Sequence, residues 1–192
     1  MNPNELWSQL KAGDKNALEQ IYRGHVDLLF KYGCRFSNNT QLVEDCVQDL
    51  FMEIWRNRKG LSQTDSIKRY LLASIRRKII KHLEKGKKLV STEDHDPSFE
   101  LEIAIEERLI DAETKIALSQ QLKKAFDSLS KRQKEAVYLK YYAGLDYEDI
   151  VTVMDIGYQS LRNLVSNALK KMKQNVGALE VIILMEYFFN FF

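Results

Sequence analysis

The residues best suited to chemistry lie late in the chain, on a predicted helix that runs from Tyr158 to about Gln174. Its apolar positions recur at helical spacing, which leaves amides, hydroxyls and one guanidinium on the opposite side. Such groups can read base edges in a DNA major groove, and lysine ammonium groups can meet phosphates. The outward residues with this chemistry are Gln159, Ser160, Arg162, Asn163, Ser166, Lys170 and Lys171. The absence of any acid in this helix favours a DNA contact over an ordinary solvated face.

The elements that precede this helix have the order of a helix-turn-helix. Asp146 is a good N-cap for a short helix, and the sequence Asp155-Ile156-Gly157 predicts the turn that follows it. Further upstream, Ser130 and Gln133 have the spacing of a capping box, and the helix that they open should end at Gly144. Two short helices with a glycine turn also occur in ordinary helical cores, so the pattern alone does not decide for DNA.

A second surface for nucleic acid is predicted by a basic stretch in the first half of the chain. Between Arg56 and Lys88 there are twelve bases and two acids, a net charge of +10. Apolar residues from Ile67 to Leu83 form the buried side of a helix there. The residues that project elsewhere and can neutralise phosphates are Arg69, Arg76, Arg77 and Lys81. From Glu93 to Glu113 the net charge is −8, which predicts an acidic linker.

The helix before the basic stretch has two contrasting faces. One face is a continuous apolar stripe at i, i+3, i+4, i+7 spacing, made of Val43, Cys46, Val47, Leu50, Phe51 and Ile54. The other face carries Asp45, Gln48, Asp49 and Met52. These residues are compatible with a solvated face, but their grouping opposite the stripe favours a binding surface. Two further helices are predicted between Leu6 and Phe36, with a break at Asn38 and Asn39.

Composition argues against a β-sheet protein, a disulfide-rich protein and a metalloprotein. The chain has only two prolines and 45% hydrophobic residues, which predicts helices with buried cores and no sheet. Cys34 and Cys46 lie in apolar helical stretches and are expected to be reduced core thiols. The three histidines are scattered, so we expect no metal site, and no motif for a cofactor or a catalytic group occurs. We therefore expect no enzymatic activity. The N-terminus has no basic segment followed by an apolar one, so export is not indicated and we expect a cytoplasmic protein.

The two halves together resemble the extracytoplasmic-function (ECF) group of sigma-70-type RNA polymerase sigma factors. The stretch from Val43 to Trp55 is similar to the family's segment of an acid, Val-Gln-acid, Phe and a terminal Trp. The block from Leu129 to Lys173 is similar to the family's fourth region, with Ser160, Leu161 and Arg162 where the family often has Thr-Val-Lys. Lys78 and Asn167 depart from the family pattern.

The resemblance implies an all-α fold of two small helical domains joined by an acidic linker. Residues 1–88 would form sigma region 2, residues 89–112 the linker, and residues 113–175 a helix-turn-helix domain of the sigma region 4 type. Core RNA polymerase would bind Asp45, Gln48, Asp49, Met52 and Trp55, although Trp55 is equally compatible with a core position. The basic helix would recognise and melt the −10 element of promoter DNA, and the loop from Asn57 to Ser66 would receive a flipped base. The late helix would read the −35 element, and an anti-sigma factor is a further expected partner.

The last segment, residues 176–192, extends beyond the resemblance and is strongly apolar. It is short for a membrane span and is interrupted by Glu180, Glu186 and Asn190, so no membrane insertion is expected. Packing on the chain's own helices, docking on a partner and self-association all remain open. For the whole protein, the main alternative is a helix-turn-helix regulator with a partner-binding N-terminal domain. A helical adaptor that binds only protein would leave the acid-free helix unexplained.

Overall fold

The computed structural model describes residues 3–87, 99 and 124–175. Every regular element in these ranges is a helix, which confirms the predicted all-α class. The chain divides into two compact units, residues 1–98 and 99–192. Within the described ranges, no helix combines the length and the apolar character that crossing a membrane requires.

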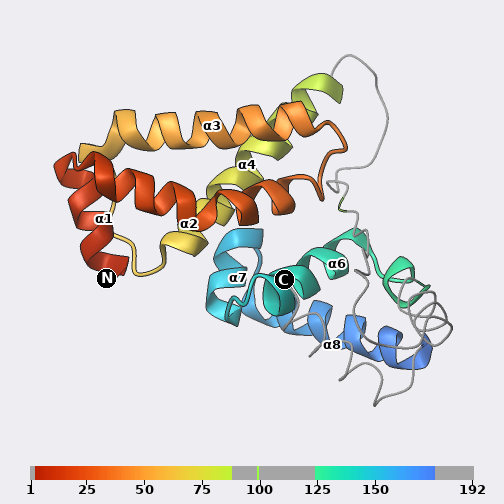
Figure 1. Cartoon of the computed structure of the whole chain (residues 1–192). Coiled ribbons are helices and arrows are strands. Elements are labelled where there is room, and N and C mark those ends of the chain that lie inside the picture. Colours follow the sequence, from red (N-terminus) through yellow and green to blue (C-terminus); the bar gives the residue numbers. More distant parts are fainter. Residues whose placement is uncertain (1–2, 88–98, 100–123, 176–192) are drawn as a thin grey trace, which may run out of the picture. The chain divides into compact units, whose positions relative to one another are not determined.

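The first unit is built on three helices that pack on one another in pairs: α2 (Lys15–Gly33), α3 (Thr40–Asn57) and α4 (Ile67–Lys87). A shorter helix, α1 (Pro3–Ala12), packs on α2, and a single 3-10 turn, η1 (Arg58–Gly60), follows α3 directly (Figure 1). The loop between η1 and α4 brings the chain back from the end of α3. The predicted helices of this half are therefore all present.

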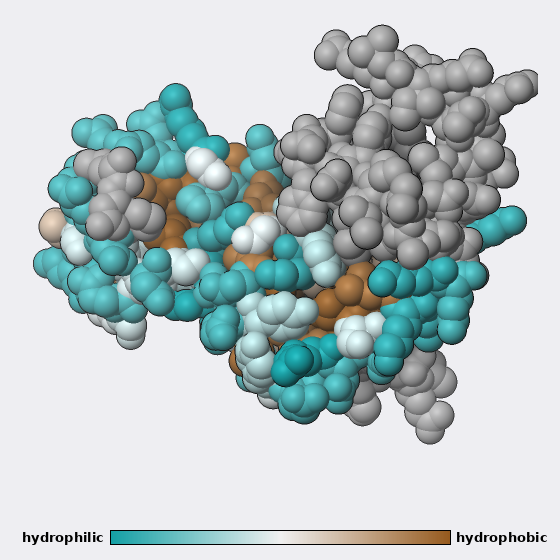
Figure 2. All heavy atoms as spheres, turned by 90° about the horizontal axis from the view of Figure 1, so that it is seen from below, coloured by the Kyte–Doolittle hydropathy of each residue, from teal (hydrophilic) through white to brown (hydrophobic). Residues whose placement is uncertain are grey.

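Local capping explains where these helices begin. The carboxylate of Asp14 accepts a hydrogen bond from the Asn16 N–H at the start of α2. The break predicted at Asn38 and Asn39 is confirmed, because the Asn39 side chain accepts from the Leu42 N–H and caps α3. The predicted stripe of α3 is also confirmed, since all six of its apolar residues are buried. On the face seen in Figure 2, hydrophobic residues (brown) are visible between hydrophilic ones (teal).

The second unit contains the predicted helix-turn-helix. Helix α6 (Lys131–Val137) opens with the capping box of Ser130 and Gln133, in which each side chain accepts from the other residue's N–H. Helix α7 (Tyr147–Met154) is capped by Asp146, and α8 (Tyr158–Asn175) follows after a short turn. Both α6 and α7 pack on α8. Gly144 has the left-handed backbone that was predicted for it.

One element differs from the expectation of a continuous α-helix up to Gly144. Residues Tyr138–Tyr142 form a π-helix, η2, in which the Ala143 N–H donates to the Tyr138 carbonyl at 2.9 Å. The wider turn admits one extra residue and allows the rings of Tyr138 and Tyr142 to stack, with centroids 4.5 Å apart. The spacing of apolar residues cannot predict a π-helix, because one added residue shifts the phase of the pattern without interrupting it.

The division between the units lies inside the predicted linker. Phe99 is only 1% exposed, and its ring packs edge-on against Tyr138 of the second unit with centroids 5.7 Å apart. The other residues of the predicted linker, 89–112, and the apolar tail, 176–192, lie outside the described residues. The exact domain boundaries therefore stay a prediction.

Two glycines of α2 offer a direct test of the packing in the first unit. A Cβ at Gly33 would lie 2.6 Å from Val43 Cγ1 and 2.9 Å from Ile79 Cδ1, where α2 meets α3 and α4. We expect Gly33→Ala to lower the free energy of unfolding by about 1–3 kcal/mol through overpacking. Gly24 meets nothing within 4 Å on the same helix, so Gly24→Ala should instead raise stability by about 0.5–1 kcal/mol. Thermal or urea unfolding measures both, and equal effects of the two variants would contradict this packing.

Candidate functional site

The outer face of α3 presents the polar residues that were predicted to bind polymerase. Asp45, Gln48 and Met52 are exposed, and Asp49 is partly exposed. Asp45 accepts a hydrogen bond of 2.9 Å from the Gln41 side chain, one turn earlier on the same face. These residues lie opposite the buried stripe, so a partner can approach them without disturbing the core.

Apolar side chains extend this surface. Met52 is 54% exposed and Tyr22 of α2 is 39% exposed, and the Tyr22 ring packs edge-on against Phe51 at 4.9 Å between centroids. Trp55 is partly exposed, and the guanidinium of Arg58 lies 4.3 Å from its ring centroid. The Arg58 Nη1 also donates to the Trp55 carbonyl at 2.7 Å, which fixes the cation over the ring. Trp55 is thus neither a fully buried core residue nor a freely exposed one.

The four predicted cations of α4 differ in their surroundings. Arg77 and Lys81 are exposed, whereas Arg69 and Arg76 are partly buried. Arg69 forms an ion pair with Asp65, and this hydrogen bond is the largest cause of a lowered Asp65 pKa. The Arg77 Nε donates to the Ala73 carbonyl at 3.2 Å, which leaves the outer nitrogens of its guanidinium for other contacts. A phosphate would therefore have to displace Asp65 to reach Arg69, but not to reach Lys81.

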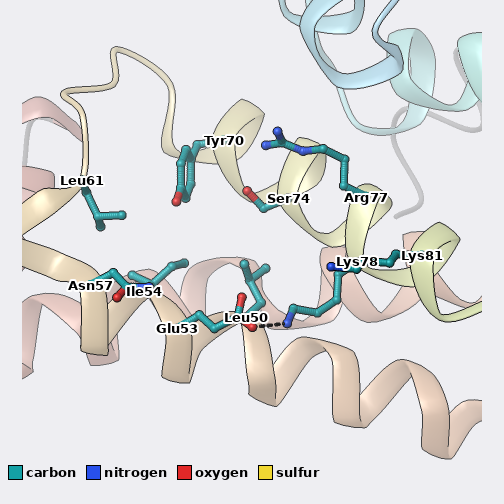
Figure 3. Close-up of a pocket in the computed structure, with 10 residues that line it drawn as sticks. All are labelled: Leu50, Glu53, Ile54, Asn57, Leu61, Tyr70, Ser74, Arg77, Lys78 and Lys81. Carbon is teal, nitrogen blue, oxygen red and sulfur yellow. Dashed lines mark hydrogen bonds and ion pairs between the residues drawn. The ribbon is translucent and has the colours of Figure 1, made fainter.

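A cavity of about 320 Å³ lies between α3, α4 and the loop that joins them (Figure 3). Its wall combines apolar and polar groups from all three segments, namely Leu50, Glu53, Ile54, Asn57, Leu61, Tyr70, Ser74, Arg77, Lys78 and Lys81. Two of the four cations predicted for DNA, Arg77 and Lys81, therefore share one pocket. Asn57 and Leu61 belong to the segment that was expected to receive a flipped base.

Lys78 connects this cavity with α3. Its Nζ lies 2.6 Å from Glu53 Oε1, as the dashed line in Figure 3 marks, and 4.0 Å from Asp49 Oδ2. The Lys78 side chain is only 13% exposed, so this pairing is less screened by water than an ordinary surface ion pair. The sequence singled out Lys78 as a departure from the family pattern, but its partner lies 25 residues away and no local pattern predicts the pair.

The loop beside the cavity is held by a residue that the sequence analysis did not single out. Trp7 of α1 is fully buried, and its indole Nε1–H donates to the Ser62 carbonyl at 2.9 Å. Its ring also packs edge-on against Tyr70, a residue of the cavity wall, with centroids 5.0 Å apart. The only available signal was a tryptophan in a short N-terminal helix, which does not reveal its contact 55 residues later.

Both cysteines and His25 lie in the described helices or directly beside them. Burial raises the pKa of both thiols, Cys34 and Cys46, which keeps them protonated at neutral pH. His25 Nδ1 lies 2.8 Å from the Ile21 carbonyl, within its own helix. In the ranges that the structure describes, no three residues of metal-binding type come together.

Helix α8 presents the predicted DNA-reading residues on its outer side. Leu161, Val165, Ala168 and Met172 are buried, whereas all seven predicted contact residues are exposed. The Gln159 amide donates to the Asn163 side chain at 3.2 Å, so these two residues are linked on the surface. Lys171 Nζ lies 3.5 Å from the Ser128 carbonyl, which directs its ammonium group toward the protein.

Comparison with known proteins agrees with this arrangement in both units. The family model "Sigma-70 region 2" matches residues 21–89, and the model "Sigma-70, region 4" matches residues 119–172. Together these segments cover more than half of the chain. The chain belongs to the sigma-70 family, in its ECF group.

Individual relatives of this sigma factor are distant in sequence. The ECF RNA polymerase sigma factor SigK of Mycobacterium ulcerans (strain Agy99) is 19% identical over 178 residues, covering 91% of this chain and 94% of that protein. Among solved structures, CnrH in complex with the cytosolic domain of CnrY has a TM-score of 0.61 at 15% identity, covering 93% of this chain and 99% of CnrH. The sigma factor RpoE from Bartonella quintana, in complex with the anti-sigma factor NepR, has the same TM-score at 22% identity, covering 83% and 96%. These structures share the fold of this sigma factor.

The contact between Trp7 and Ser62 predicts a measurable effect on the loop of this sigma factor. Trp7→Phe keeps an aromatic ring but removes the donor to Ser62, so the loop should open more often. We expect amides of residues 61–66 to exchange with solvent up to about tenfold faster, because a net hydrogen bond contributes about 0.5–1.5 kcal/mol. Trp55→Phe is the control and should leave this exchange unchanged. Unaltered loop exchange in Trp7→Phe would show that α1 does not restrain the loop.

Proposed function

We propose that this sigma factor binds core RNA polymerase and directs it to promoters through two DNA-binding surfaces, one in each unit. Residues 1–88 act as region 2 and residues 113–175 as region 4, with residues 89–112 as the linker. The observation that carries the proposal is the outer side of α8. All seven predicted contact residues are exposed there, on a helix without a single acid. Sigma factors are transcription initiation factors and not enzymes, and we assign this one to the cytoplasm.

Polymerase binding is assigned to the outer face of α3. The carboxylates of Asp45 and Asp49 suit basic partner groups, and Met52 and Trp55 add apolar area beside them. Interfaces of this composition derive most of their affinity from a few central side chains, with charges that set orientation and association rate. The buried stripe on the other side of α3 keeps the face rigid.

Recognition of the −10 element is assigned to α4 and the adjoining cavity. Arg77 and Lys81 supply positive charge for the phosphates at the cavity, and Arg69 and Arg76 extend the basic surface. The volume of about 320 Å³ is at the lower end of the range for small-ligand sites and suits a single nucleobase taken out of the stack. Asn57 and Ser74 in its wall can hydrogen-bond to a base edge.

An anti-sigma factor is the remaining proposed partner. CnrH and the Bartonella quintana RpoE were both solved in complexes, with the cytosolic domain of CnrY and with the anti-sigma factor NepR. A protein that covers the outer face of α3 would compete directly with polymerase.

The alternative function is a helix-turn-helix regulator with a partner-binding N-terminal domain. It does not account for the basic surface of α4 or for the cavity beside it. The two functions are separated by mixing the purified chain with core RNA polymerase. A sigma factor co-elutes with the enzyme and permits promoter-dependent transcription, whereas a regulator does neither on its own.

For polymerase binding, we expect the double variant Gln48→Ala and Asp49→Ala to bind core enzyme at least tenfold more weakly, because hot-spot side chains contribute more than about 1.4 kcal/mol. Helicity and melting should change little. Asp49 also faces Lys78 at 4.0 Å, so Gln48→Ala alone is measured beside the double variant. Glu5→Ala, which removes an exposed acid of α1, controls for net charge. Unchanged co-elution of the double variant with core enzyme would refute the assignment of this face.

For the −35 element, Arg162→Ala should cost about 1–3 kcal/mol on the preferred promoter and relax the base preference at one position. Lys170→Ala should weaken all sequences alike and reduce the slope of log affinity against log salt by about one, since it meets phosphate. Lys170 serves better here than Lys171, whose ammonium group is directed toward Ser128. Binding is measured with holoenzyme, and full promoter discrimination by Arg162→Ala would mean that α8 is not the reading helix.

A further inference from the structure

An exposed aromatic ring stands at the beginning of the reading helix. Tyr158 is the first residue of α8 and is 47% exposed, although nearly every other large apolar side chain in the described ranges is covered. It directly precedes Gln159 and Ser160, which are exposed in the same turn. The exposed part of the ring therefore offers apolar contact area directly beside polar groups that could read base edges.

The Tyr158 ring lies against a second aromatic ring. Its centroid lies 5.9 Å from that of Tyr147, the first residue of α7, at an interplanar angle of 50°. Tyr147 is itself held by Lys140, whose Nζ lies 5.1 Å from the Tyr147 centroid and donates to the Leu145 carbonyl at 3.2 Å. A chain of contacts from Lys140 through the Tyr147 ring to the tilted Tyr158 ring thus joins the starts of both helices of the helix-turn-helix.

We propose that Tyr158 is a specificity-determining residue of α8, whose ring packs against the 5-methyl group of a thymine in the upstream promoter element. The proposal rests on the proposed function, in which α8 enters the major groove. In helix-turn-helix proteins the N-terminal residues of the second helix contact base edges, and Tyr158 begins that helix. Thymine is the only base that presents a methyl group in this groove, and apolar side chains read it by contact.

The polar residues of α8 do not account for recognition of a thymine methyl group. Gln159, Arg162 and Asn163 supply donors and acceptors, which distinguish bases by hydrogen bonds that do not involve a methyl group. The phenol hydroxyl of Tyr158 offers a different contact, a hydrogen bond to phosphate. Tyr158→Phe separates the two, because it keeps the ring and removes the hydroxyl.

The test uses holoenzyme made with core RNA polymerase and duplexes with a randomised upstream element. After the preferred sequence has been selected, each thymine in it is replaced singly by deoxyuridine, which removes only the methyl group. We expect the wild type and Tyr158→Phe to lose about fourfold in affinity at one thymine, the worth of burying one methyl group. Tyr158→Ala should bind the selected duplex more weakly and be indifferent to the methyl group at that position. Circular dichroism and melting establish that the variants are folded.

The proposal is tested by comparing the effect of the thymine methyl group on binding by the wild type and by the two Tyr158 variants. An equal methyl dependence in wild type and Tyr158→Ala, or a preferred sequence without thymine, overturns it. A Tyr158→Phe variant that behaves like Tyr158→Ala also overturns it, in favour of a phosphate contact by the hydroxyl. Failure of the proposed function looks different, because wild-type holoenzyme would then enrich no upstream sequence at all.

Discussion

Burial of the apolar stripe of α3 is the constraint on which the first unit depends. The six residues of this stripe, from Val43 to Ile54, can leave water only against α2 and α4. That requirement fixes the rotation of α3 about its axis, and the face with Gln48 and Met52 must then point outward. The close approach at Gly33, which leaves no room for a Cβ between Val43 and Ile79, holds the three helices at this distance. The face that we propose for polymerase binding is thus exposed as a consequence of core formation.

Two cations of α4 in this unit form ion pairs with nearby acids. Arg69 is matched by Asp65, and Lys78 by Glu53, whereas Lys81 protrudes from α4. An acid that is paired with a cation lowers the gain from any phosphate that replaces it, so these pairs would weaken nonspecific DNA binding at the basic surface that we propose for α4. Because Asp49 belongs to the outer face of α3 and its Oδ2 lies 4.0 Å from Lys78 Nζ, the charge on that face and the charge at the cavity are not independent.

Much of this arrangement follows from local sequence patterns. The caps at Asn39, Ser130 and Asp146 and the left-handed residue Gly144 were predictable, because each depends on a few neighbouring residues. The outward residues of α8 were predictable from a period of 3.6. What could not be predicted depends on contacts between distant segments, as in Trp7 with Ser62 and Lys78 with Glu53. The π-helix η2 is local, but its one added residue shifts the phase of the apolar pattern without interrupting it, so the pattern does not reveal the change in hydrogen bonding.

The Trp7 indole has a further consequence for spectroscopy. The chain contains only two tryptophans, and they lie in contrasting environments. Trp7 is enclosed beside the loop of the cavity, so its emission reports the state of that loop from a nonpolar, hydrogen-bonded setting. Trp55 is partly exposed beneath the cation of Arg58, so its emission should respond to molecules that bind at the surface of α3. A variant that keeps only Trp7 therefore reports on the loop beside the cavity, and a variant that keeps only Trp55 reports on the outer face of α3. Neither needs an added label.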